Sequence, residues 1–162
     1  MTFYYLETSG LLKRYRSELG SSVVDQLFNG KRPDEEFVTS HLTVVEVTAV
    51  ASRMLKGRLL RRSQYDNLVG RLVRDITDYR VTVLPLEERV SVEALDLYPE
   101  YALRAPDALH FVSAMQTSRA VHPEPVHVVS ADREVGEACQ RYGLPLLNPE
   151  SPSAASALAA LR

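Results

Sequence analysis

Four carboxylates occupy positions where they could form a catalytic or metal-binding site. Glu7 directly follows one short apolar run, and Asp132 follows another after two intervening residues. Glu46 lies within an apolar and β-branched stretch, and Asp107 comes directly after a proline. If these four acids converged, their like charges would repel one another. Divalent cations would relieve that repulsion, because Mg²⁺ and similar ions prefer oxygen ligands.

Each acid also has a structural explanation. Asp107 and Asp132 could stabilise the N-termini of helices, and Glu7 could lie on the surface or at a helix start. Glu46 is harder to explain, because a carboxylate among so many apolar residues is either exposed on one helix face or buried with a partner. His110 follows Asp107 on the same helix face and could be either a core histidine or a donor to one of the acids.

Other chemistries have little support in the sequence. It contains neither of the glycine-rich patterns that cradle nucleotide phosphates. The four histidines lack the spacing of a zinc site, and Ser9 and Ser130 have no evident histidine partner for nucleophilic catalysis. A phosphate-accepting receiver domain would carry an aspartate at the end of its third strand, where this chain has Leu84-Pro85-Leu86.

The elements that would position the acids alternate along the chain. Short apolar runs predict five strands, at residues 3–6, 37–39, 81–84, 126–129 and 144–147. Helical periodicity and capping residues predict helices at 8–15, 21–29, 42–54, 63–78, 87–97, from 106 onward and at 132–142, with a loop at 31–36.

This order predicts an α/β fold of three layers, α/β/α, with a five-stranded parallel sheet, because strands separated by helices pair in parallel. Ligands of such sheets bind beyond the carboxyl ends of the strands, where Glu7 and Asp132 fall. We expect a single domain at residues 1–149. The Ala- and Ser-rich residues 150–162 read as a weakly specified tail, with a terminal helix as one option.

Charge is unevenly distributed over the 162 residues. The net charge is -2, but residues 53–74 carry seven basic side chains and one acid, so the remainder carries -8. A basic segment on an acidic body can hold a polyanion, although it can equally be a solvated helix face. The single Cys139 favours a buried thiol in a reducing cytoplasm, and the absence of a long apolar run or signal pattern predicts no membrane association.

Several short motifs, in their order and spacing, resemble the PIN domain family, in particular VapC-type toxins of bacterial toxin-antitoxin pairs. The resemblance spans residues 3–149 and rests on residues 5–15, Glu46, 104–110, 129–132, 143–144 and 148–149. It implies a five-stranded parallel sheet and a metal-dependent ribonuclease. The matching acids are Glu46, Asp107 and Asp132, with Ser9 as a polar contributor. The family usually has Asp after the first strand, where this chain has Glu7.

From this resemblance we expect Glu7, Glu46, Asp107 and Asp132 to hold one or two Mg²⁺ or Mn²⁺ ions that activate water against an RNA phosphodiester. A small antitoxin protein and a second copy of the chain are the expected partners. The alternative is a weak or inactive PIN scaffold that binds RNA or protein, because Glu7 adds a methylene to the site. The basic residues expected to hold RNA are Lys13, Arg14, Arg16, Arg53, Lys56, Arg58, Arg61 and Arg62.

Overall fold

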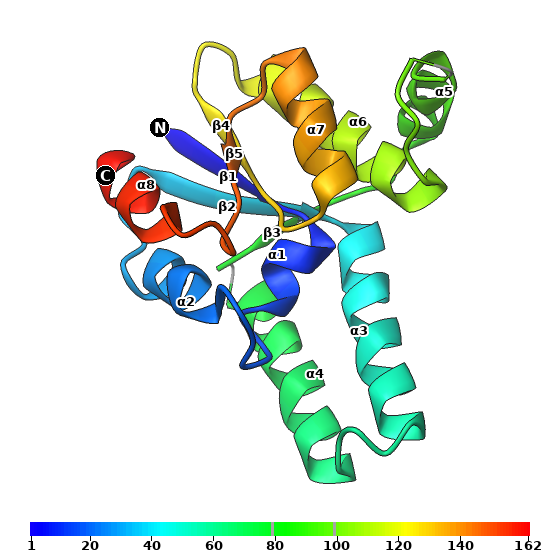
Figure 1. Ribbon diagram of the computed structural model, residues 1–162, viewed down its shortest axis with the longest axis vertical. Helices are drawn as coiled ribbons and strands as arrows, with labels where there is room; N and C mark the ends of the chain where they lie inside the picture. The colour runs from blue at the N-terminus through cyan, green and yellow to red at the C-terminus, as the bar shows by residue number, and fades with distance from the viewer. Residues whose placement is uncertain (79, 99) are drawn as a thin grey trace.

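A parallel five-stranded sheet runs through the middle of the molecule (Figure 1). The computed structural model describes residues 1–78, 80–98 and 100–162. The strands are β1 (Thr2–Leu6), β2 (Glu35–Ser40), β3 (Thr82–Leu84), β4 (Val126–Val129) and β5 (Leu146–Leu147), in the order β3-β2-β1-β4-β5. The chain moves outward from β1 to one edge and then returns to the other side of β1. The strand order therefore reverses between β1 and β4.

Helices cover both faces of this sheet, which confirms the predicted three-layer α/β/α fold. One core contains side chains of α1 (Thr8–Leu12), α2 (Ser21–Asn29), α3 (His41–Lys56), α4 (Arg62–Thr77) and α8 (Ala154–Ala160). The other contains side chains of α5 (Glu88–Asp96), α6 (Ala105–Val121) and α7 (Arg133–Tyr142). Alternation along β1 supplies both cores, since Tyr4 and Leu6 enter the first and Tyr5 enters the second.

Several element boundaries differ from the sequence-based prediction, and two of them have a clear physical cause. Helix α1 ends at Leu12 rather than near residue 15, because the next backbone amides, of Arg14 and Tyr15, bond three residues back in tighter turns. Strand β2 begins at Glu35, inside the predicted loop. The Glu35 carboxylate is buried and accepts hydrogen bonds from Arg162 at 2.8 Å, a tertiary contact that polarity along the sequence does not reveal.

The last helix packs onto the core. Ala154 and Leu158 of α8 are buried in the same cluster as residues of α2, and the Arg162 guanidinium also donates to the Leu27 carbonyl. The predicted boundary at residue 149 stays a prediction, and the segment after it contributes to the core. Cys139 is buried, and burial raises the pKa of its thiol to about 12, as expected for a structural thiol.

No helix within the described part of the chain is both long and apolar enough to cross a membrane.

Helix α1 approaches β4 so closely that only glycine fits at the contact. A Cβ atom on Gly10 would lie 2.3 Å from the Val129 carbonyl oxygen, which is backbone and cannot rotate away. The amide of Glu7 donates to the same carbonyl at 3.1 Å. Gly10 therefore determines how closely the residues after β1 approach those after β4.

We expect Gly10→Ala to lower the free energy of unfolding by about 1–3 kcal/mol or more, because the added methyl group must displace backbone. Urea denaturation measures this. Gly70→Ala is the matched control: its Cβ would meet only the end of the Arg74 side chain, at 3.7 Å, in the middle of α4. There alanine should stabilise by about 0.5–1 kcal/mol. Equal effects of the two substitutions would contradict the close approach.

Candidate active site

The candidate site lies at the carboxyl ends of β1 and β4, where the strand order reverses. Glu7 follows β1, and Ser130, Ala131 and Asp132 follow β4. In open parallel sheets this reversal leaves a crevice that commonly binds ligands. The residues that sequence analysis singled out after these two strands therefore stand in the expected place.

Glu7 is buried and serves as the N-cap of α1. Its Oε2 atom accepts hydrogen bonds from the Ser9 amide at 3.0 Å, the Ser9 hydroxyl at 2.5 Å and the Ser130 hydroxyl at 2.8 Å. The Ala131 amide donates to the Ser9 hydroxyl at 2.8 Å, and the Asp132 amide donates to the Ser130 hydroxyl at 3.0 Å. These bonds tie the ends of β1 and β4 together around one carboxylate oxygen.

The two carboxylate oxygens of Asp132 have different hydrogen-bond partners. Its Oδ1 atom caps α7 by accepting from the amides of Glu134 at 2.8 Å and Val135 at 3.1 Å. Its Oδ2 atom accepts from the Arg104 guanidinium at 3.2 Å. The helix-capping explanation of Asp132 is therefore confirmed. Its second oxygen is joined through the Arg104 guanidinium to Asp107.

Asp107 lies in the first turn of α6 and is nearly buried. Burial and the nearby charge of Asp132 raise the pKa of its carboxyl, and these effects outweigh the opposing Arg104 guanidinium, whose Nε donates to Asp107 Oδ2 at 2.9 Å. The charge of Glu7 raises the pKa further. The negative charges of both Asp132 and Glu7 therefore act on the Asp107 carboxyl.

Glu46 belongs to a second group of polar side chains beside the first. Its Oε2 atom accepts from the Thr8 hydroxyl at 2.5 Å and from His110 Nε2 at 2.8 Å. His110 is buried, and its Nδ1 lies 3.3 Å from the Tyr5 hydroxyl, within hydrogen-bond distance. The hydrogen bond from His110 is the main reason why the pKa of Glu46 is lowered, against the effect of burial. Thus His110 is a core histidine and also a donor to one of the acids.

Sequence reasoning missed Arg104 and Thr8 as parts of this site. Arg104 stands three residues before Asp107, the spacing of an ion pair on one helix turn, and that spacing was the available signal. Thr8 is the first residue of the predicted helix at 8–15. Its contact with Glu46 joins α1 to α3, and no local pattern in the sequence predicts such a contact.

The oxygen donors fit a hard divalent cation by their chemistry, but their present placement is not that of a ligand cage. Across residues 1–78, 80–98 and 100–162, no three His, Cys, Asp or Glu side chains are placed to hold one metal ion. Glu7 is turned toward Ser9 and Ser130, Glu46 toward His110, and Asp107 and Asp132 toward Arg104. The four predicted acids are therefore held by three separate sets of partners.

Five of the predicted RNA-binding residues are exposed at the far end of the α3–α4 pair. Figure 1 shows these two helices projecting side by side from the sheet, joined by a turn at their tip. Residues at this end are Arg53, Lys56, Arg58, Arg61 and Arg62. Arg53 is on the same helix as Glu46 and contributes to lowering its pKa. The basic tip, defined as these five residues, is therefore linked to the site through α3.

The other three basic residues predicted to hold RNA, Lys13, Arg14 and Arg16, follow β1 and are less exposed than the basic tip. Lys13 is buried, and its Nζ pairs with Glu18 at 3.2 Å and Glu150 at 2.5 Å. Arg14 pairs with Asp25 and Asp75, and Arg16 is half-buried beside Glu18. This corrects the sequence-based interpretation: Lys13 and Arg14 stabilise the fold instead of presenting their charges to solvent. Polarity alone could not distinguish these two roles.

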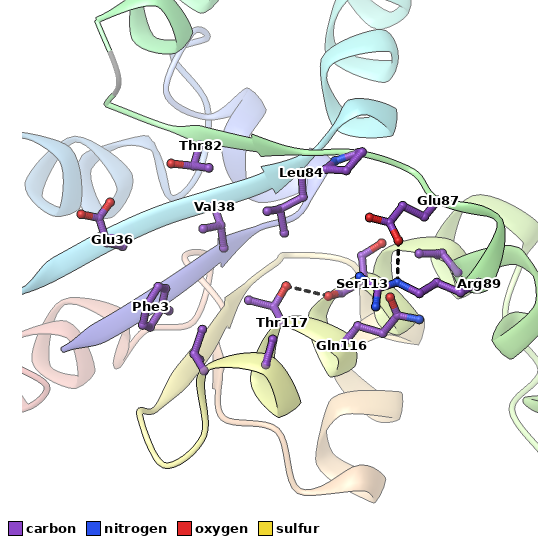
Figure 2. Close-up of a pocket in the computed structure, with 14 residues that line it drawn as sticks. Phe3, Glu36, Val38, Thr82, Leu84, Glu87, Arg89, Ser113, Gln116 and Thr117 are labelled. Atoms are coloured by element: carbon purple, nitrogen blue, oxygen red, sulfur yellow. Dashed lines mark hydrogen bonds and ion pairs between the residues drawn. The ribbon is translucent and has the colours of Figure 1, made fainter.

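A separate cavity of about 390 Å³ lies away from the four acids (Figure 2). It is formed where β2 and β3 meet α6 and the start of α5, with Phe3, Val38 and Leu84 on its sheet side. Thr117 and Gln116 line its helix side, and Glu87 pairs with Arg89 at its rim at 2.7 Å. None of the four acids lines it, so we do not assign the chemistry to this cavity.

The sheet order and the acids beyond β1 and β4 define an α/β protein with an acidic site at its strand-order reversal. The sequence of residues 4–141 matches the PIN domain family. This match covers most of the chain, which therefore belongs to the PIN domain family. No curated protein sequence matches the chain significantly.

Solved structures with the same fold include toxins and toxin-antitoxin complexes. VapC20 of Mycobacterium tuberculosis, described as a sarcin-ricin loop cleaving toxin, is 14% identical with a TM-score of 0.61, covering 83% of this chain and 94% of that one. FitAcB from Neisseria gonorrhoeae is 19% identical with a TM-score of 0.62, covering 90% and 97%. VapBC-1 from nontypeable Haemophilus influenzae is 12% identical with a TM-score of 0.63, covering 93% and 100%. At these identities the likeness concerns the fold.

We expect His110→Asn to raise the pKa of the Glu46 carboxyl, because His110 supplies the strongest hydrogen bond to the ionised form. Because the pKa of Glu46 is lower in the folded protein than its ordinary value of 4.5, its ionised carboxylate stabilises the fold above pH 4.5. That stabilisation is lost as the pH falls through the pKa that Glu46 has in the folded protein. The variant should therefore lose less stability on acidification. Carboxyl ¹³C NMR titration measures the pKa, and Glu93, whose pKa is lowered by other partners, is the internal reference. An unchanged Glu46 pKa would contradict the assignment.

Proposed function

We propose that this PIN-domain protein is a metal-dependent endoribonuclease and the toxin component of a toxin-antitoxin pair. The observation that carries the proposal is the gathering of Glu7, Asp107 and Asp132 beyond β1 and β4, with Glu46 beside them. Membership of the PIN family and the fold shared with an RNA-cleaving toxin support it. A bacterial cytoplasm, where RNA and antitoxin would both be present, is the expected location.

Glu7, Glu46, Asp107 and Asp132 would hold one or two Mg²⁺ or Mn²⁺ ions through their oxygens. When bound, such an ion lowers the pKa of a water molecule and stabilises charge on the phosphodiester. Ser9 and Ser130 fix the direction of the Glu7 carboxylate, and His110 and Thr8 fix that of Glu46. Ser130 and His110 are buried, and positioning by such partners limits the movement that would otherwise reduce the rate.

RNA would follow the exposed face of α3 from the acids to the basic tip. Arg53, Lys56, Arg58, Arg61 and Arg62 would contact its phosphates, and single-stranded loops are the preferred targets because their bases are unpaired. A small antitoxin protein and a homodimer are the proposed partners. Support for the antitoxin is the fold shared with chains from toxin-antitoxin complexes.

The second candidate function is a weak or inactive PIN scaffold that binds RNA or protein. The hydrogen bonds of Glu7 favour it, because its Oε2 atom is engaged as the cap of α1 and by Ser130. Cleavage assays with the unmodified protein separate the two functions: RNA that binds in the presence of Mg²⁺ or Mn²⁺ without being cut would support the scaffold.

We expect Asp107→Asn to lower RNA cleavage by about 10²-fold or more, since even outer partners of metal ligands contribute about 10- to 100-fold. Its melting temperature should be unchanged or higher, because the raised pKa of Asp107 shows that the ionised carboxyl is disfavoured in the fold. Total RNA with Mg²⁺ or Mn²⁺ is the substrate. Asp96→Asn, an exposed acid on α5, is the control. Equal cleavage by Asp107→Asn and the unmodified protein would refute the nuclease assignment.

We expect Lys56→Gln/Arg61→Gln to weaken RNA binding and to reduce the salt dependence of the binding constant. Each lost phosphate contact lowers the slope of log K against log salt by about 0.7 for single strands, so the double variant should lose about 1.4. Binding to a fluorescent single-stranded RNA at several salt concentrations measures this slope. The control is Arg89→Gln/Arg133→Gln, which removes the same charge from exposed positions on other helices. Identical slopes for both variants would exclude the basic tip as the RNA contact.

A further inference from the structure

One guanidinium group contacts three carboxylates at the candidate site. Arg104 Nε lies 2.9 Å from Asp107 Oδ2 and 3.6 Å from Glu134 Oε2, and an Nη atom lies 3.2 Å from Asp132 Oδ2. Asp107 and Asp132 are two of the acids proposed to hold a metal ion. A cation from the chain itself is therefore already bound to the oxygens that a divalent cation would need.

The local structure explains why Arg104 reaches both acids. Its backbone is the N-cap of α6, so its side chain lies one turn before Asp107 and beside the start of α7, where Asp132 is the N-cap. The Arg104 side chain is 68% exposed, whereas that of Asp107 is 11% exposed. The guanidinium therefore covers the acids from the solvent side and can leave without unpacking the core.

The hydrogen bonds of Asp132 leave only one of its oxygens available to a cation. Because Oδ1 is held by the amides of Glu134 and Val135, Oδ2 is the oxygen left to face a cation, and Arg104 binds it. On Asp107 the guanidinium also takes Oδ2. A metal ion at about 2.0–2.6 Å from these oxygens would compete with the N–H donors aimed at the same atoms, and its charge would repel the guanidinium.

We propose that Arg104 is a built-in competitor for the metal ion, bound to Asp107 and Asp132 until a divalent cation displaces it. This inference rests on the proposed function. Arg104 neutralises part of the repulsion between the acids and thereby raises the metal concentration at which the site fills. A planar guanidinium suits the role because one group can donate to two carboxylates at once.

A purely structural role for Arg104 makes the opposite prediction. If the guanidinium only fastened α6 to α7, its loss would loosen the two acids, and the affinity for metal would fall or stay the same. If it competes, its loss frees both oxygens and the affinity rises. The sign of the change therefore separates the two roles.

The test measures the affinity for Mn²⁺, both by calorimetry and by the electron paramagnetic resonance signal of free Mn²⁺. Losing the two exposed ion pairs to Asp107 and Asp132, each worth about 0.2–1 kcal/mol, predicts that Arg104→Gln binds Mn²⁺ roughly 2- to 30-fold more tightly. Arg104→Lys, which keeps the charge but cannot bridge both acids, should fall between Arg104→Gln and the unmodified protein. Arg133→Gln is the matched control, since it removes the same charge next to Asp132 from a side chain that is 84% exposed and paired with Glu137. It should change the affinity less than twofold.

The outcomes distinguish failure of the competition from failure of the proposed metal site. Equal or weaker Mn²⁺ binding by Arg104→Gln would overturn the competition, and so would an equal gain in Arg133→Gln, which would indicate a general charge effect. In either case, loss of the site in Asp107→Asn would leave the proposed metal site standing. Absence of Mn²⁺ binding in both the unmodified protein and Arg104→Gln would overturn the competition and the metal site together. Thermal melting of all variants without metal checks that each is folded.

Discussion

Repulsion between carboxylates at the carboxyl ends of β1 and β4 is the constraint around which this site is built. Strand pairing and the close approach at Gly10 force Glu7 toward the residues after β4, and α6 brings Asp107 to the same place. Gathered acids destabilise a fold unless each charge has compensation. Two hydroxyls and an amide compensate Glu7, helix amides and Arg104 compensate Asp132, and Arg104 compensates Asp107.

The partners that compensate the acids differ in their effect on ionisation and in their exposure. Glu46 is stabilised in its ionised form by His110, whereas Asp107 is held in a setting that disfavours ionisation. Fixed partners keep Glu46 and Glu7 in place, while the partner of Asp107 is an exposed side chain that can move. The contacts of Asp107 and Asp132 with Arg104 are therefore the ones that solvent reaches most directly.

Outside the site, basic side chains also fall into two sets, one paired within the fold and one exposed to solvent. Basic side chains near α1 are used inside the fold, since Lys13 joins Glu18 to Glu150 and Arg14 joins Asp25 to Asp75. The five residues of the basic tip are exposed, and they lie at the end of α3 and α4, which project from the sheet (Figure 1). A net charge near zero therefore conceals two populations of arginine and lysine with different roles.

The sequence by itself determined the alternation of strands and helices, the parallel sheet, and the position of Glu7 and Asp132 after strands, because periodicity and capping are local properties. It also identified Glu46 as anomalous, since a lone acid in an apolar stretch is visible without coordinates. Only the tertiary structure decided which partner each acid has. Arg104, His110 and Thr8 meet the acids across different elements, and burial turned Lys13 from a candidate RNA contact into an internal ion pair. These contacts join residues that are far apart in the sequence, so they depend on how the helices and strands pack and leave no local sequence pattern.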